Sequence, residues 1–279
     1  MTPELGAGLL LALASAAALN WGYYAQHGAV AKLPPLSLRR PVHSLALLFR
    51  NPRWFAGFAI GIGGWVFYVV ALALAPLSLV QAASAGGIAL LAALVGSLSS
   101  RERAAVVVAV AGLVLLGVSL IGVHAPTGHG SWAAVASWMG ASVGAAAFAA
   151  GPLGRALAGG AGLGIAAGVL YAAGDVGTKA AVAGGGRLTF VPALLACHGL
   201  AFVALQLGFQ RGSALATAGM ATLWTNALPI AAGTILFGES VPSGIRGVAR
   251  VAAFACVVLG AAFLARPEPA VVAQPEPID

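Results

Sequence analysis

The chain has 279 residues, of which 60% are hydrophobic and only 8% are charged, with a formal net charge of +7. Soluble domains carry about 25% charged residues, so this composition excludes a soluble globular protein. A membrane-spanning helix needs about 20 apolar residues, and this chain has room for roughly nine of them. We therefore expect an all-α, multi-pass protein of the cell membrane, with the lipid bilayer around it.

The apolar runs predict nine transmembrane helices. In chain order they cover 5–26, 53–75, 77–98, 104–122, 131–150, 160–182, 188–209, 212–237 and 245–265. The segment 41–49 is apolar but too short to cross a bilayer alone. No Lys or Arg precedes the first run, unlike a cleaved signal peptide, so we expect that run to be retained. The tail, 267–279, is acidic and rich in proline, which predicts disorder.

The basic residues fall in loops rather than on one folded face, so they indicate membrane topology and not nucleic-acid binding. With nine spans, an outer N-terminus places most of the 14 Lys and Arg residues on the cytoplasmic side and leaves four on the outer half. The outer four are Lys179, Arg187, Arg246 and Arg250. The positive-inside rule therefore predicts an outer N-terminus and a cytoplasmic C-terminus.

The first four and the last four predicted helices resemble two copies of one unit. Gly63 aligns with Gly199, and Asn20 aligns with Asp175. Because the helix at 131–150 stands alone between the copies, the second copy enters the membrane from the opposite side. This predicts a 4+1+4 inverted repeat, with a first repeat at 1–130, a linker helix at 131–158 and a second repeat at 159–266. Many secondary transporters are built this way, with a binding site between the repeats.

Asp175 and Lys179 lie inside the apolar run at 160–182. A charge at membrane depth costs about 2.5–3.5 kcal/mol on insertion scales, so it usually faces a cavity or a partner. The i, i+4 spacing puts both side chains on one helix face, where they can neutralise each other. Two interpretations stay open: a pair that only fixes helix packing, and a pair that lines a translocation path.

Other polar side chains inside the predicted spans are candidates to line the same path. Asn and Gln in a span also form interhelical hydrogen bonds, which is the alternative role. His198 is either a packing histidine or a proton-binding group. The candidate binding or coupling residues are Asn20, Tyr24, Gln81, Tyr171, Asp175, Lys179, His198, Thr225 and Asn226, with Ser84 and Thr222 beside them.

The sequence has no HExxH motif and no glycine-rich phosphate loop that follows a strand. An aspartyl dyad needs a second intramembrane Asp besides Asp175. His124 and His129 have no acid nearby, and Cys197 and Cys256 lie in apolar runs as expected for packing thiols. We expect neither an enzyme nor a cofactor or metal site.

Two segments carry a resemblance to a known family. ALAPLSLVQAASAGGIALLAALVGSLSSRE (73–102) and its echo GFQRGSALATAGMATLWTNALPIAAGTILFGES (208–240) resemble the drug/metabolite transporter superfamily, also called EamA-like. Both have an apolar run, a turn of small residues and a terminal Glu. The nine-span count and the turn at Pro76 are closest to the NIPA-type branch, a group of proposed magnesium transporters. Where that branch carries Glu and Asn, this chain has Gly64 and Tyr68.

The resemblance implies a secondary transporter that moves a small solute or ion across the membrane by alternating access. A NIPA-like divalent-cation carrier and a membrane scaffold that transports nothing are the alternatives. The sequence leaves open whether the protein forms a homo-oligomer.

Overall fold

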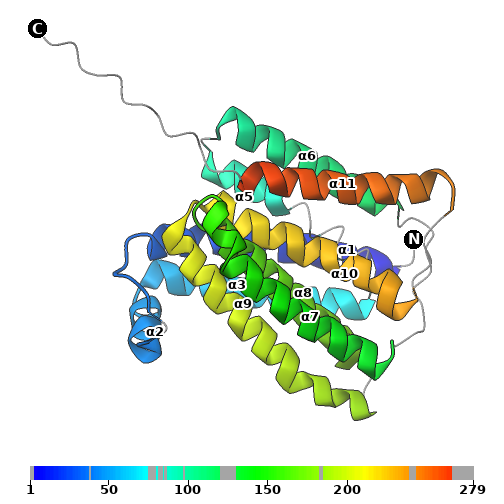
Figure 1. The fold of residues 1–279 in the computed structure, drawn as a ribbon, viewed down its shortest axis with the longest axis horizontal. Helices are drawn as coiled ribbons and strands as arrows, with labels where there is room; N and C mark the ends of the chain where they lie inside the picture. Colours follow the sequence, from blue (N-terminus) through cyan, green and yellow to red (C-terminus); the bar gives the residue numbers. More distant parts are fainter. Residues whose placement is uncertain are drawn as a thin grey trace, which may run out of the picture.

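The computed structural model describes residues 3–37, 39–74, 80, 84, 87–96, 98–119, 130–181, 185–238 and 243–265. Within these ranges every regular element is a helix, as expected (Figure 1). The elements are α1 (Pro3–Val30), α2 (Pro41–Phe49), α3 (Pro52–Leu74), α5 (Gly87–Val95), α6 (Ser100–Ser119), α7 (Trp132–Ala150), α8 (Ala161–Ala181), α9 (Val191–Arg211), α10 (Met220–Phe237) and α11 (Ile245–Ala265). Short 3-10 helices η1 (Leu153–Ala156) and η2 (Gly185–Phe190) and a π-helix η3 (Leu215–Gly219) join them.

Six helical segments of the described chain are long and apolar enough to cross a membrane. They are Gly6–Val30, Pro52–Ala71, Trp132–Ala156, Ala161–Ala181, Gly185–Arg211 and Leu215–Phe237. The other three predicted spans, 77–98, 104–122 and 245–265, are not among them, so the count of nine is not confirmed. The first two of these three fall partly outside the described residues, and the Pro76 turn and the whole of the tail 267–279 lie outside them.

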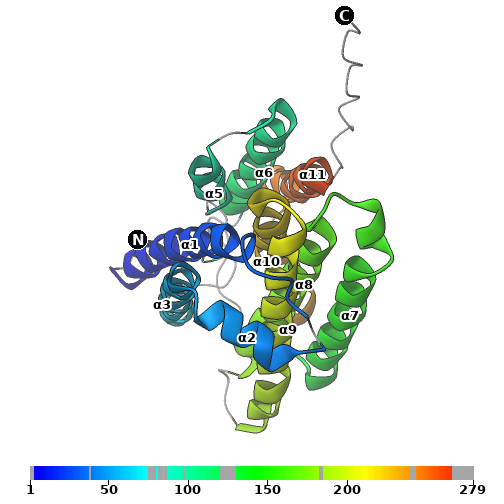
Figure 2. The same ribbon diagram turned by 90° about the vertical axis from the view of Figure 1, so that its left-hand side faces the viewer.

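Helix α8 is the centre of the bundle. In the most apolar 18-residue stretch of α8, 83% of the residues are buried. The corresponding share is 61% for the span that ends in α10 and 28–33% for the other four candidate spans. It packs against α7, α9 and α10, which surround it in Figure 2. Large apolar side chains such as Phe55, Val66 and Leu195 are exposed on the outer helices, as expected for surfaces that face lipid. Asp175 and Lys179 therefore lie in the candidate span with the largest share of buried residues.

Two glycines bring α1 and α3 together. A Cβ atom on Gly22 would lie 2.6 Å from the carbonyl oxygen of Gly57, so a side chain there would force the helices apart. Small residues let membrane helices approach closely and gain dispersion contacts along their length. The tight α1–α3 pair is thus a direct consequence of glycine at these two positions.

One end of the bundle, here named the Arg211 end, gathers termini from several helices. The His27 Nε2 atom at the end of α1 donates to the carbonyl oxygen of Gly212, just beyond α9, over 3.2 Å. Gly159, just before α8, packs directly on the backbone of Arg211. Helix α1 therefore ends where α8 begins, and the two helices run in opposite directions.

The same opposition holds for two further pairs of helices. The Trp54 Nε1 atom at the start of α3 donates to the Gln206 Oε1 atom near the end of α9 over 2.8 Å. The Arg250 Nε atom near the start of α11 donates to the Ser119 Oγ atom at the end of α6 over 3.4 Å. Helices α3 and α9 are therefore antiparallel, and so are α6 and α11. The opposite end of the bundle, where α9 begins, is named the Arg187 end.

Candidate functional site

Asp175 and His198 face each other across the contact between α8 and α9. The His198 Nε2 atom lies 3.6 Å from the Asp175 Oδ1 atom, and the His198 Nδ1 atom lies 2.9 Å from the Leu194 carbonyl oxygen. The side chain of Asp175 is 7% exposed and that of His198 is 20% exposed. The carboxylate therefore points at a protein partner and not at lipid, as intramembrane charges usually do.

Aromatic side chains from three helices surround this pair. The centroid of the His198 ring lies 5.8 Å from that of Tyr171 on α8 and 6.5 Å from that of Trp65 on α3, both edge to face. Tyr23 on α1 is within electrostatic range of Asp175 and of Tyr171. We name Tyr23, Trp65, Tyr171, Asp175 and His198 the Asp175 cluster. Of these, Tyr171, Asp175 and His198 were predicted as site residues, whereas Tyr23 was missed.

The expected ion pair between Asp175 and Lys179 is wrong. Lys179 lies one turn beyond Asp175 on α8, is half-buried, and forms no ion pair with it in this fully described helix. The i, i+4 spacing fixes only the shared helix face, and the imidazole of His198 from α9 lies against the carboxylate. A neighbouring helix therefore supplies a partner for Asp175.

Asn20 and Asn226 are buried but bind within their own helices. The Nδ2 atom of Asn20 donates to the Ala16 carbonyl over 2.9 Å, and that of Asn226 donates to the Thr222 carbonyl over 2.7 Å. Among the described residues, neither Oδ1 atom has a hydrogen-bond partner. Asn20 packs directly on Gly87 of α5. The hydrogen bonds of both amides thus stay within their own helices.

Two other predicted residues lie away from the Asp175 cluster. The ring of Tyr24 lies 5.9 Å from the guanidinium carbon of Arg53, near the Arg211 end. The Thr225 Oγ1 atom donates to the Gly168 carbonyl over 3.3 Å, which ties α10 to α8. Gln81 lies outside the described residues. Ser84 and Thr222 are buried, and their hydroxyls have no hydrogen-bond partner in the part of the chain that is described.

A buried chain of hydrogen bonds at the Arg211 end was not predicted. The Trp54 Nε1 atom donates to Gln206 Oε1 over 2.8 Å, and Gln206 Nε2 donates to Gln26 Oε1 over 2.6 Å. All three side chains are at least 96% buried. They join α3, α9 and α1. The sequence signal for this chain is that Gln26 and Gln206 each lie in or next to an apolar run. Their positions in the sequence do not show that the two side chains meet.

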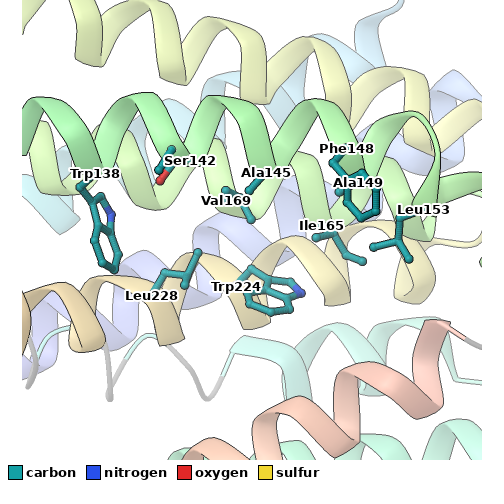
Figure 3. A pocket seen from close by; sticks show the side chains of 11 residues that line it. Trp138, Ser142, Ala145, Phe148, Ala149, Leu153, Ile165, Val169, Trp224 and Leu228 are labelled. Carbon is teal, nitrogen blue, oxygen red and sulfur yellow. The ribbon is translucent and has the colours of Figure 1, made fainter.

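A separate cavity of about 390 Å³ lies between α7, α8 and α10 (Figure 3). Its lining is apolar and is formed by Trp138, Ala141, Ser142, Ala145, Phe148, Ala149, Leu153, Ile165, Val169, Trp224 and Leu228. The indole N–H groups of Trp138 and Trp224 have no acceptor among the described residues. None of the lining residues belongs to the Asp175 cluster, so this cavity is distinct from the predicted polar path.

Metal-ligating side chains do not cluster in the described ranges, where no group of three or more His, Cys, Asp or Glu residues is placed to hold an ion. His124 and His129 lie outside those ranges. Cys197 is buried and Cys256 is half-buried, and both are free thiols. Comparison with known proteins finds no matching family model, no similar curated protein and no similar solved structure.

Proposed function

We propose that this protein is a secondary transporter that moves a small solute across the membrane by alternating access, with the Asp175 cluster on its translocation path. The observation that carries the proposal is a carboxylate in the most buried span, partnered by a histidine from the adjacent helix. Ionisable groups inside membrane bundles mark substrate or proton pathways by default. The resemblance to the drug/metabolite transporter superfamily is part of this proposal.

The directions and contacts of the helices support two inverted halves. Helix α1 packs against α3 and α5, as α8 packs against α9 and α10, and α6 packs against α11. In the proposed 4+1+4 arrangement α1 is equivalent to α8, α3 to α9, α5 to α10 and α6 to α11. Helix α7 connects the two halves. The antiparallel pairs α1/α8, α3/α9 and α6/α11 are what an inverted repeat requires.

The two ends of the bundle differ, which supports a conformation closed at one end. At the Arg211 end, α1 packs against α9. The hydrogen bonds from Trp54 to Gln206 and from Gln206 to Gln26 hold α3, α9 and α1 together there. The equivalent pair at the Arg187 end is α8 with α3, and over their described residues these helices do not pack closely. Alternating access predicts that a second conformation breaks the first contact and forms the second.

The charges support a cytoplasmic Arg211 end. By the directions of their helices, the described basic residues nearest that end are Lys32, Arg39, Arg40, Arg50, Arg53, Arg101, Arg103, Arg155 and Arg211. Only Lys179, Arg187, Arg246 and Arg250 lie toward the other end. The positive-inside rule then gives an outer N-terminus and a cytoplasmic C-terminus, in the cell membrane.

Transport by the purified protein is tested in proteoliposomes against a panel of small amines, neutral metabolites, organic acids and Mg²⁺. The proposal predicts that at least one solute enters faster than it enters protein-free liposomes, with saturation at high concentration. If every solute enters at the protein-free rate from either side, the protein is a scaffold and not a transporter.

A further inference from the structure

The hydrogen bond at His198 Nδ1 fixes one proton on the imidazole. A backbone carbonyl oxygen only accepts hydrogen bonds, and the Leu194 oxygen lies 2.9 Å from Nδ1. Nδ1 must therefore carry a hydrogen and donate it. In a neutral imidazole one nitrogen donates and the other accepts, so Nε2 of a neutral ring would present a bare lone pair.

That lone pair would face another acceptor. The Asp175 Oδ1 atom lies 3.6 Å from Nε2, and an ionised carboxylate only accepts hydrogen bonds. Two facing acceptors in a site where the Asp175 side chain is 7% exposed repel each other without water to separate them. The contact is stable only with one additional proton, either on Nε2 or on the carboxyl group.

We propose that Asp175 and His198 form a proton-binding site that holds one proton between Oδ1 and Nε2. With that proton the pair has no net charge, as an imidazolium–carboxylate pair or as a neutral imidazole accepting from a carboxylic acid. This explains how α8 keeps an acidic residue at membrane depth without Lys179 as its counter-charge. A role of this proton in coupling rests on the proposed transport function, but the proton binding itself does not.

The surroundings of the pair contain few other ionisable groups. Tyr23 from α1 and Tyr171 from α8 are within electrostatic range of Asp175, and α8 also carries Lys179 one turn away. Helix α3 contributes the ring of Trp65, which does not titrate. Helices α7 and α10 have no titratable side chain. The remaining ionisable residues on elements packed against α8 or α9 are Glu4, Tyr24, His27, Arg155, Arg187, Arg211, Arg246, Arg250, Cys197 and Cys256.

The test is nitrogen NMR of the protein labelled with ¹⁵N-histidine in lipid bilayers at neutral pH. The chain has five histidines, so the His198 signals are identified by their loss in His198→Gln. A variant with the other four histidines replaced by Gln gives the same assignment if His198→Gln does not fold. The proposal predicts a hydrogen on Nδ1, and a second hydrogen bonded to or shared with Nε2.

Variants of α8 then separate the pair from its neighbours. In Asp175→Asn the second hydrogen belongs to the amide, so His198 should revert to an ordinary neutral ring with its proton on Nδ1. Lys179→Met should leave the wild-type His198 signals unchanged. A wild-type spectrum in which Nδ1 carries no hydrogen, or in which Nε2 neither carries a hydrogen nor accepts one from the carboxyl group, would overturn the proposal. Because these spectra need no solute, they test proton binding independently of the transport assay. Proton binding can therefore be confirmed when transport is not, and the reverse.

Discussion

The ring of His198 packs directly on the backbone of Gly174, in the space that a Cβ atom on residue 174 would fill. This contact lets α9 approach α8 closely enough for the next residue, Asp175, to meet the imidazole. The glycine is therefore part of the geometry of the pair, and the role of Asp175 depends on it.

We expect Gly174→Ala to displace His198 from Asp175, because the new methyl group would occupy the position of the ring. The NMR signature of the shared proton should disappear, and uptake in proteoliposomes should fall by more than tenfold, or more than about 1.4 kcal/mol in barrier. Gly199→Ala on α9 is the matched control, since no heavy atom lies within 4 Å of its Cβ position. Equal behaviour of the two variants would contradict the assigned contact.

Lys179→Met and His198→Gln distinguish the two candidate partners of Asp175. Since the carboxylate faces His198 and not Lys179, the lysine variant should retain uptake within about tenfold of wild type, a barrier change below about 1.4 kcal/mol. The histidine variant should lose uptake. The reverse order of the two rates would restore the lysine as the functional counter-charge.

Gln206→Leu should destabilise the Arg211 end. The change leaves the Trp54 indole N–H and the Gln26 side chain buried without their partner. A buried polar group that loses its hydrogen bond costs about 1–3 kcal/mol. Thermal unfolding in detergent micelles measures the loss as a lower melting temperature.

Gln210→Leu is the comparison for that experiment. Gln210 lies on the same helix and accepts from the Leu36 amide over 2.8 Å, but its surroundings are partly exposed, so water can replace the bond. Its melting temperature should fall less than that of Gln206→Leu. An equal fall in both variants would show that the buried chain contributes nothing special to the contact of α1, α3 and α9.

Gly22→Val should separate α1 from α3. The valine side chain would collide with the Gly57 backbone, whereas Gly63→Val meets no atom within 4 Å at its Cβ position. We expect the first variant to lower the melting temperature in detergent by several degrees and the second to leave it nearly unchanged. Similar melting temperatures would mean that the glycine contact is not needed for α1–α3 packing.

The helices were predictable because hydrophobic length is a local property of the sequence. The run at 160–182 predicts α8 within a residue at each end, and its small residues fit its central, closely packed position. The all-α class followed from the same signal. Helical spacing also placed Asp175 and Lys179 on one face of that helix.

The partners of the polar residues were not predictable, because they depend on which helices meet. Spacing alone favoured Lys179 for Asp175, whereas the packing of α9 supplied His198. Asn20 was expected to line a path, but its amide reaches the carbonyl four residues earlier in its own helix. The Gln26–Gln206 bond joins residues 180 positions apart, and no local pattern indicates such a contact.

Uptake by Asp175→Asn tests the central claim most directly. The variant keeps the size of the side chain and removes its charge, and Lys179→Met serves as the control for a lost charge on the same helix. For a solute that wild-type proteoliposomes accumulate, we predict that Asp175→Asn takes it up no faster than protein-free liposomes, while Lys179→Met remains active. Full uptake by a well-folded Asp175→Asn protein, equal to wild type for every solute, would contradict the account.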